Sequence, residues 1–315
     1  MSNIVKVSNV RLRRLQRRFV TVDVFTERAY RGNPLAVVLD TDGLTAQEMQ
    51  QIAREFNYSE TTFVFPARES SHTAHVRIFT PRIEVPFAGH PNIGTAVVLA
   101  DELDAGLSSF VEPIIFEEAA GLVAIHFLRA GRRVIGAELA TPEALSVLRT
   151  VSDADAAACI SLLPLEVSVI THPPHVLSVG LPWLVVEVTT RDALRRSSPD
   201  LAAHQRVLPP LGIDGVMAYY HVPGTCELHS RVYAPLDGTI EDPATGSAAA
   251  AAIALRAFLR PEPNLELTWH IEQGADLGRP SSLFGRTIKA SGRLASIYIG
   301  GHAVIVMRGT LNRLP

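Results

Sequence analysis

The stretch that decides the fold is Arg77-Ile-Phe-Thr-Pro81, followed after a short segment by Phe87-Ala-Gly-His-Pro-Asn-Ile-Gly-Thr-Ala96. A second stretch repeats it as Arg231-Val-Tyr-Ala-Pro235, followed by Glu241-Asp-Pro-Ala-Thr-Gly-Ser-Ala248. The arginines are 154 residues apart (77 to 231) and the aligned glycines 152 (94 to 246), so the spacing differs by only two residues. Because an internal repeat marks a duplicated structural unit, the sequence predicts two similar lobes.

The segments around the two copies alternate between strand-like and helix-like patterns. Thr45–Phe56 has the spacing of an amphipathic helix, with Thr45 able to cap its start. Further helices are expected over about 91–102, over Ser152–Leu162 and over about 246–259. The expected strands are Val20–Phe25, Leu35–Leu39, Thr61–Phe65, His75–Phe79, Val111–Phe116, Leu122–Phe127, Val134–Leu139, Leu165–Ile170, Val176–Val179, Leu184–Val188, Val216–His221, His229–Tyr233, Leu265–Ile271, Thr287–Ala290, Leu294–Ile299 and Ala303–Met307.

The order of these elements indicates the fold class. The strands come in pairs between helices, without the regular alternation of strand and helix that a doubly wound parallel sheet requires. A mixed, largely antiparallel sheet wrapped around a helix fits better. We expect a flexible basic N-terminal extension over 1–18, an N-terminal lobe over 19–130 and a C-terminal lobe over 131–302. The last strand, about 303–315, is expected to complete the N-terminal lobe.

Composition excludes several classes of protein. The chain has 315 residues, of which 47% are apolar and 19% charged, which is enough for packed cores. A net charge of −3 gives no reason to expect nucleic acid or an anionic membrane as a partner. No apolar run is long enough to span a membrane. Two cysteines exclude a disulfide framework and fit a reducing compartment, so we expect a cytoplasmic protein.

Each repeated turn places small residues at the first turn of a helix: Gly94-Thr95-Ala96 in one copy and Gly246-Ser247-Ala248 in the other. A helix start carries unpaired N–H groups and a partial positive charge, so it attracts anionic oxygen. Two such starts facing one cleft would hold a small anionic substrate from both sides. The alternative is that both helices are simply well capped and tightly packed.

Three side chains near these turns are candidates for chemistry. His90 lies in Ala-Gly-His-Pro at the start of the first helix, although an isolated histidine is more often structural. Asp242 precedes Pro243 at the start of the second helix and could act only as a cap. Glu60 opens a strand, where a glutamate is usually a solvated charge, and composition alone would not single it out.

These residues carry a family resemblance over residue 19 to the C-terminus. The chain resembles the phenazine-biosynthesis isomerase (PhzF-like) family, whose motifs appear here in the family's order. The matching segments are Val22-Asp-Val-Phe-Thr26, Gly32-Asn-Pro-Leu-Ala-Val-Val38, Asn57-x-Ser-Glu-Thr-Thr-Phe-Val64, Pro86-Phe-Ala-Gly-His-Pro91, Gly94-Thr95-Ala96, Glu241-Asp-Pro-Ala-Thr-Gly-Ser-Ala248, Gln273-Gly274, Gly278-Arg-Pro-Ser281 and Gly300-Gly301-x-Ala303.

The resemblance implies a diaminopimelate-epimerase-like α+β fold, with two pseudo-equivalent lobes and the active site in the cleft between them. It implies an isomerase that needs no cofactor and no metal and that moves a proton between carbons of a small, cyclic amino-hydroxy acid. It also implies a homodimer.

The family's functional residues carry over to matching positions of this chain. The resemblance implies that Glu60 is the acid/base and that His90 and Asp242 hold the substrate and assist. It places substrate binding at Gly89, Thr245, Gly246 and Ser247. A carboxyl group in this role needs a pKa raised toward neutrality, which burial in a closed cleft can provide.

The sequence also bears on three other functions: two-cysteine racemisation, metal binding and binding without catalysis. Racemases and epimerases of this fold use a cysteine at each turn, but Cys159 and Cys226 lie outside both turns. The histidine pairs 72/75 and 172/175 lack further ligands at metal-binding spacing. A non-catalytic small-molecule-binding protein that keeps the cleft remains the alternative from another class.

Overall fold

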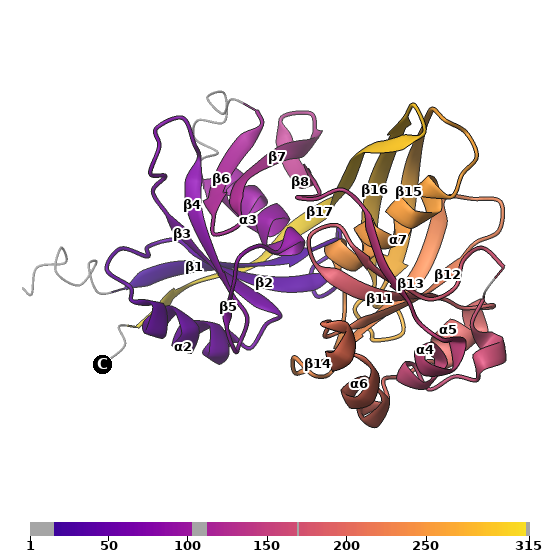
Figure 1. Ribbon diagram of the computed structural model, residues 1–315. Coiled ribbons are helices and arrows are strands. Elements are labelled where there is room, and N and C mark those ends of the chain that lie inside the picture. Colours follow the sequence, from indigo (N-terminus) through magenta and orange to yellow (C-terminus); the bar gives the residue numbers. More distant parts are fainter. Residues whose placement is uncertain (1–15, 103–111, 169, 313–315) are drawn as a thin grey trace, which may run out of the picture.

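The computed structural model describes residues 16–102, 112–168 and 170–312, which form an α+β fold with one mixed sheet and few helices (Figure 1). The helices are α2 (Ala46–Phe56), α3 (Gly89–Glu102), α4 (Asp153–Cys159), α5 (Arg191–Arg196), α6 (Leu201–Val207) and α7 (Gly246–Phe258). The strands are β1 (Arg17–Val24), β2 (Asn33–Val38), β3 (Glu60–Phe65), β4 (Ala74–Phe79), β5 (Glu84–Val85), β6 (Ile114–Glu118), β7 (Gly121–Ala130), β8 (Arg133–Ala140), β9 (Ser146–Thr150), β10 (His175–Ser178), β11 (Pro182–Glu187), β12 (Val216–His221), β13 (Glu227–Ala234), β14 (Thr239–Asp242), β15 (Leu265–Gln273), β16 (Ser281–Ala290) and β17 (Arg293–Leu311).

The strand pairing repeats itself along the chain. From β1 to β8 the pairs are β1–β2 antiparallel, β2–β3 parallel, β3–β4 and β4–β5 antiparallel, β4–β6 parallel, then β6–β7 and β7–β8 antiparallel. From β10 to β17 the same series recurs in the same order and with the same directions. The described chain therefore has two halves of one topology, as the sequence repeat predicted.

The arginines that open the repeat also make equivalent contacts. In the first half Arg77 on β4 forms an ion pair with Glu84 of β5, and its guanidinium lies 5.3 Å from the Phe79 ring centroid. In the second half Arg231 on β13 pairs with Glu241 of β14 and lies 5.4 Å from the Tyr233 ring centroid. Each pair ties a short strand to its neighbour directly before the helix α3 or α7 begins.

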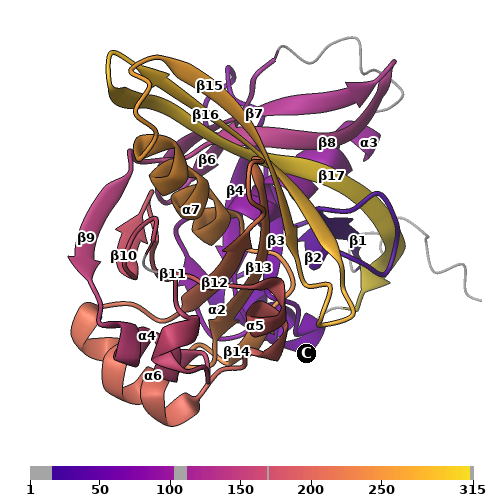
Figure 2. The same ribbon diagram turned by 90° about the vertical axis from the view of Figure 1, so that its right-hand side faces the viewer.

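The helices α3 and α7 form the centres of the two halves. Helix α3 packs against β1, β2, β7 and β8, and α7 against β10, β11, β16 and β17 (Figures 1 and 2). Both helices are buried on nearly every side; in α7 every residue from Ala248 to Leu255 is buried. Such a helix has no polar face, so its small alanines allow strands to approach it closely. At its N-terminus, the Cβ position of Gly246 lies 3.6 Å from the Phe25 ring of the first half.

Strand β17 joins the halves. Its first part, Arg293–Gly300, pairs with β16, its middle pairs with β8, and Ala303–Leu311 pairs with β1. The two strand-like runs expected over Leu294–Ile299 and Ala303–Met307 are therefore one continuous strand. The glycines between them allow the crossing with β8, because a Cβ on Gly136 of β8 would lie 2.2 Å from the Gly301 carbonyl oxygen.

The lobe boundary differs from the expected one. Gly131 and its neighbour Arg132, where the C-terminal lobe was expected to begin, form the turn between β7 and β8. Strand β8 therefore belongs with α3 and the first half. Strand β1 begins at Arg17, inside the expected extension 1–18, because Arg17 pairs with Leu311. The rest of that extension, through residue 15, lies outside the described residues.

Some sequence predictions of local structure are confirmed and others are wrong. Thr45 and Glu48 form the expected capping box of α2. The strand expected over Leu165–Ile170 is wrong: Pro164–Glu166 is a 3₁₀ turn, and Val167 makes only an isolated bridge to Val188. The helices α5 and α6 and the short strands β5, β9 and β14 were not expected, since they are too short for periodicity to show.

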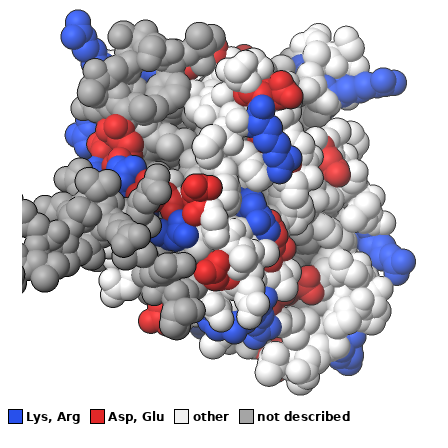
Figure 3. Space-filling model, turned by 90° about the vertical axis from the view of Figure 1, so that its left-hand side faces the viewer, with Lys and Arg blue, Asp and Glu red and all other residues white. Residues whose placement is uncertain are grey.

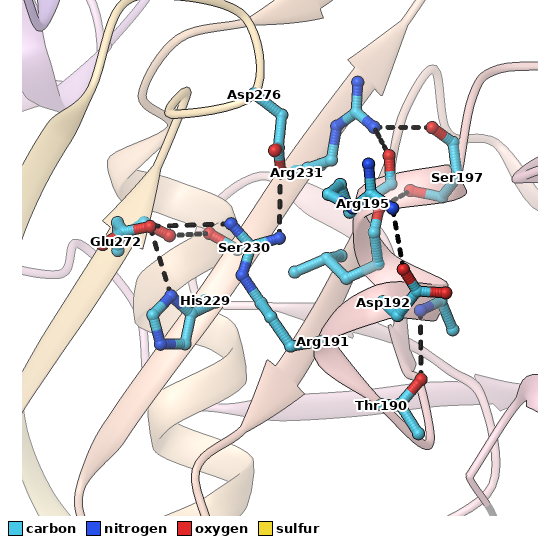
Figure 4. A network of polar contacts seen from close by, with 12 residues as sticks. Thr190, Arg191, Asp192, Arg195, Ser197, His229, Ser230, Arg231, Glu272 and Asp276 are labelled. Carbon is cyan, nitrogen blue, oxygen red and sulfur yellow. Dashed lines mark hydrogen bonds and ion pairs between the residues drawn. The ribbon is translucent and has the colours of Figure 1, made fainter.

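The short helices α4, α5 and α6 cover one end of the second half (Figures 1 and 2). Figure 4 shows how α5 is attached to the sheet: Arg191 reaches Glu272 of β15 and Asp276 beyond it. In the same network Arg231 donates to the backbone carbonyls of Arg195 and Ser197 at the end of α5. Arg231 thus anchors α5, which lies between β11 and β12 as α2 lies between β2 and β3 in the first half.

The surface carries mixed charge. On the face of the first half shown in Figure 3, both basic and acidic side chains lie among uncharged ones. The ion pairs of the chain include those of Arg18 with Asp40 and of Arg308 with Glu102. No helix among the described residues is both long and apolar enough to cross a membrane. The same residues contain no cluster of three or more histidine, cysteine, aspartate or glutamate side chains arranged to hold a metal ion.

Candidate active site

Glu60, His90 and Asp242 come together although they lie far apart in the sequence. Glu60 is the first residue of β3, opposite Leu35 of the parallel strand β2, and His90 lies in the first turn of α3. Asp242 is the last residue of β14, just before α7. Glu60 Oε2 lies 3.3 Å from His90 Nε2, and Ser59, next to Glu60, donates to Asp242 Oδ1 at 3.3 Å. The site therefore lies where the two repeated turns meet.

The Glu60 carboxyl is held in an environment that favours its neutral form. Its side chain is 18% exposed, and among the described residues nothing donates a hydrogen bond to the buried Oε2. Burial raises the pKa of Glu60 to about 8, and the negative charge of Asp242 adds to this effect. A carboxyl that titrates near neutrality can both accept and donate a proton under physiological conditions.

His90 is neutral. Its side chain is 7% exposed, and burial lowers its pKa to about 3. Nε2 approaches Glu60 Oε2 without the alignment of a hydrogen bond, so both atoms are buried polar atoms without a hydrogen-bond partner in the described part of the chain. Two unsatisfied polar atoms side by side are costly in a protein interior. Their arrangement suits a ligand that would bond to both.

Asp242, in contrast, is surrounded by donors. Its Oδ1 accepts from Asn33 Nδ2 at 2.9 Å and from Ser59, and its Oδ2 accepts from Thr245 Oγ1 at 2.6 Å. Burial raises the pKa of Asp242 to about 6, while the hydrogen bonds from Thr245, Asn33 and Ser59 oppose that rise. Asp242 is therefore the more acidic member of the Glu60–Asp242 pair.

The residues expected to bind substrate lie around these groups. Gly89 is the first residue of α3, and Gly246 and Ser247 are the first two of α7. The Ser247 hydroxyl accepts a hydrogen bond from the indole N–H of Trp183 at 3.0 Å. Because an indole N–H can only donate, the hydroxyl hydrogen of Ser247 is left free for another acceptor. Ser247 is thus oriented as a donor.

Thr245 has a different position from the one expected of a substrate-binding residue. Its hydroxyl donates to Asp242 Oδ2 and accepts from Gln273 Nε2 at 3.0 Å, so both of these contacts lie within the protein. Gln273 also donates to the Asp242 carbonyl at 2.8 Å and accepts from the Thr245 backbone N–H at 3.1 Å. Thr245 therefore organises the start of α7 around Asp242.

Sequence reasoning missed four residues that shape the site: Asn33, Ser59, Trp183 and Gln273. Three of them lie inside motifs that carry the family resemblance, so their presence there was the available signal. Trp183 lies in no such motif, and its contact with Ser247 depends on the packing of β11 against α7. No periodicity or spacing could have indicated it.

An open pocket lies elsewhere on the described surface. It has a volume of about 320 Å³ and is bordered by the turn after β1, by β15 and β16, and by His302 of β17. None of Glu60, His90 or Asp242 lines it. The candidate site is therefore the place where Glu60 and Asp242 meet, which is separate from this pocket.

Comparison with known proteins gives one consistent family. Residues 22–309 match the PhzC-PhzF family, described as phenazine biosynthesis-like protein. The chain is 38% identical over 303 residues to an uncharacterized isomerase of Mesorhizobium japonicum, covering 94% of this chain and 98% of that protein. It is 32% identical over 311 residues to trans-2,3-dihydro-3-hydroxyanthranilate isomerase of Pseudomonas chlororaphis, covering 93% and 98%.

A solved structure agrees with these sequence matches. The crystal structure of the PhzF-family phenazine biosynthesis protein of Bacillus anthracis superimposes with a TM-score of 0.82 at 26% identity. The superposition covers 94% of this chain and 99% of that protein. The mixed sheet and central helices described above are therefore those of a known fold. The chain belongs to the phenazine biosynthesis-like (PhzC-PhzF) family, and it is an isomerase.

Proposed function

We propose that the protein is a cofactor-independent isomerase in which Glu60 moves a proton between two carbons of a small, cyclic amino-hydroxy carboxylic acid. The observation that carries the proposal is the buried Glu60 carboxyl, whose pKa of about 8 leaves it able to exchange a proton near neutral pH. A single carboxyl that takes a proton from one carbon and returns it to another on the same face needs neither metal nor cofactor.

The neighbouring groups take the remaining roles in this proposal. Neutral His90, with Nε2 beside Glu60 Oε2, holds the substrate against Glu60, which acts as the proton shuttle. Asp242 holds the substrate from the second half and raises the pKa of Glu60 through its charge. Ser247 and the N–H groups at Gly89 and Gly246, at the starts of α3 and α7, bind its anionic oxygen.

The two halves act in this proposal as the pseudo-equivalent lobes of a diaminopimelate-epimerase-like fold, with the substrate between them. Two-thiol racemisation has no support in this chain. Cys159 is buried in the apolar core of the second half, and Cys226 precedes β13. Neither belongs to the turns that carry His90 and Asp242.

The test is proton exchange at substrate carbon in deuterated water. Cyclic amino-hydroxy acids are screened, with trans-2,3-dihydro-3-hydroxyanthranilate included because related proteins are named for it. The native protein should convert at least one acid with deuterium uptake at carbon, and Glu60→Gln should lower the rate by about 10³-fold or more while still binding it. Binding without exchange in the native protein would instead support a non-catalytic binding protein.

The rate should also depend on pH with a definite sign. Because burial raises the pKa of Glu60 to about 8, most of the protein carries a proton on Glu60 at pH 7. Glu60 must be ionised to take a proton from carbon, so kcat/KM should rise as pH increases and level off above about 8. A pH profile that falls across the same range would contradict the role of Glu60 as the initial base.

We further propose that the protein works as a homodimer in the cytoplasm. Light scattering on the purified protein would test the oligomeric state, and cell fractionation the location. Both experiments are independent of the assignment of Glu60.

A further inference from the structure

Asn33 of the first half donates a hydrogen bond directly to Asp242 of the second half. Its Nδ2 donates to Asp242 Oδ1 at 2.9 Å and to the Ala244 carbonyl at 2.8 Å. The orientation of the amide is fixed, because the Ala244 carbonyl oxygen can only accept and therefore needs Nδ2 of Asn33 beside it. Asn33 is fully buried, so no water replaces it as the donor to Asp242.

The other oxygen of Asp242 is held by an equally fixed chain of donors. The Thr245 backbone N–H can only donate, so it places Gln273 Oε1 toward itself and Nε2 toward the Thr245 hydroxyl. Thr245 Oγ1 therefore accepts from Gln273 and must donate its own hydrogen to Asp242 Oδ2. Both oxygens of Asp242 thus receive hydrogen bonds, and such bonds stabilise the ionised form.

Nothing comparable holds the Glu60 carboxylate. In the described part of the chain its buried Oε2 has no hydrogen-bond donor, and neutral His90 lies 3.3 Å from it. We propose that Asn33 is a positioning residue that keeps Asp242 ionised, so that Glu60 is the member of the pair that takes up and releases the proton. This inference rests on the proposed function, in which Glu60 is the proton shuttle.

The charged groups around the pair support the same assignment. Glu241, which precedes Asp242, is bound by Arg231, but its charge still raises the pKa of Asp242, as burial does. Without the donor from Asn33, only the hydrogen bonds from Thr245 and Ser59 would oppose these two effects. Asp242 would then compete with Glu60 for the proton, and both carboxyl groups would take up and release it.

Asn33 is held in place by a second contact between the halves. Arg279, in the loop between β15 and β16, donates to the Gly32 carbonyl at 2.8 Å and to Asp23 Oδ1 at 2.8 Å. The Gly32 N–H in turn donates to the Pro280 carbonyl at 3.2 Å. Because the residue before Asn33 is fixed to the second half, the Asn33 amide reaches Asp242 only when the halves are together.

The experiment measures where Asp242 titrates, in the absence of any substrate. Infrared difference spectra follow the stretching band of protonated carboxyl groups in the Glu60→Gln variant, where Glu60 itself no longer contributes. Asp242 should then titrate near pH 6. Adding Asn33→Leu should raise this midpoint by roughly one to two pH units, because a hydrogen bond to an ionised group is lost.

Three further variants make the result interpretable. Asp242→Asn should remove the titrating band, which separates it from buried Glu118, whose pKa burial raises to about 8. Thr245→Val, which removes the donor to Oδ2, should also raise the midpoint. Gln50→Leu, which removes the hydrogen bond that the Gln50 side-chain amide of α2 donates to the Thr80 carbonyl, should leave the midpoint unchanged.

An unchanged midpoint in a folded Asn33→Leu variant would overturn the proposal, and Asn33→Ala replaces that variant if it does not fold. The outcome is separate from that of the proposed function, because the titration needs no turnover. A protein that binds acids without converting them could still show the expected shift, and an active isomerase could lack it.

Discussion

At the scale of single residues, hydrogen-bond donors decide what a buried glutamate does. Glu117 accepts from the backbone N–H groups of Glu69 and Arg68 and from His72, and these donors lower its pKa to about 2. Among the described residues Glu60 has no donor at its buried oxygen, so nothing offsets the burial that raises its pKa to about 8. The two side chains are chemically identical, so the difference comes from what surrounds them.

The orientation of Ser247 gives a prediction at this scale. Trp183→Phe keeps most of the ring but removes the N–H that holds the Ser247 hydroxyl as a donor. We expect KM for an anionic substrate to rise about 3- to 10-fold with a smaller change in kcat. A rise of this size is what the loss of one hydrogen bond usually causes. Steady-state kinetics on an acid that the exchange screen identifies as a substrate measures both.

A matched control for this change exists within the chain. Trp269 is buried on β15, and its indole N–H donates to the Thr287 hydroxyl at 2.9 Å, away from the site. Trp269→Phe should cost similar stability, about 1 kcal/mol, but leave KM unchanged. Equal KM effects in the two variants would show that the Trp183 change acts through general stability and not through Ser247.

At the scale of elements, capping and burial explain why the helices form where they do. Helix α2 begins at a capping box in which the Thr45 hydroxyl accepts from the Glu48 N–H and the Glu48 carboxylate accepts from the Thr45 N–H. Its buried residues Met49, Ile52 and Ala53 lie on one face. The pattern was legible in the sequence because α2 lies on the surface.

Helix α2 gives the prediction at this scale. Thr45→Ala should lower the free energy of unfolding by about 1 kcal/mol, because it removes the hydroxyl that accepts from the Glu48 N–H and donates to the Glu48 carboxylate. Urea denaturation monitored by circular dichroism measures the change. Thr45→Ser, which keeps the hydroxyl, should lose much less; a loss equal to that of the alanine variant would exclude capping as the cause.

Helices α3 and α7 were predicted from a different signal than the periodicity that predicted α2. Both are buried nearly all round, so neither shows an amphipathic stripe. The repeated motifs at their N-termini indicated them instead. The three-residue turn Pro164–Glu166 shows the opposite case: an apolar run was read as a strand, yet Leu165 is 77% exposed. A short apolar run has no periodicity strong enough to separate the possibilities.

At the scale of the whole molecule, β17 and the contacts near Asp242 connect the two halves. Strand β17 pairs successively with β16, β8 and β1, so it belongs to both halves. Its crossing with β8 requires glycine on both strands, at Gly136 and at Gly300, where a Cβ would lie 2.7 Å from the Ala137 carbonyl oxygen. This crossing brings the starts of α3 and α7 together, which places His90 and Asp242 around Glu60.

The crossing gives a prediction at this scale. Gly136→Ala would set a methyl carbon 2.2 Å from the Gly301 carbonyl oxygen, and a backbone atom cannot move aside as a flexible side chain can. We expect a loss of about 3 kcal/mol or more in the free energy of unfolding, with activity lost in whatever fraction folds. Chemical denaturation together with the exchange assay measures both effects.

The control for this prediction separates steric contact from backbone freedom. Gly121, at the start of β7, has a φ of +120° and nothing within 4 Å of its Cβ position. Gly121→Ala should therefore show the conformational cost alone, about 1–2 kcal/mol. A Gly136→Ala variant no less stable than this control would mean that the strands can separate without cost.

The sequence by itself determined the duplicated architecture, the family and three candidate side chains of the site, Glu60, His90 and Asp242. The repeat was visible because both copies keep the same arginine, aromatic and proline positions before a small-residue helix start. It could not show that β8 belongs to the first half, that β17 is one strand, or that, in the part of the chain that the structure describes, the buried Oε2 of Glu60 lacks a donor while Asp242 has three. Those features depend on which atoms from distant segments come within hydrogen-bond distance, and only the tertiary structure decided that.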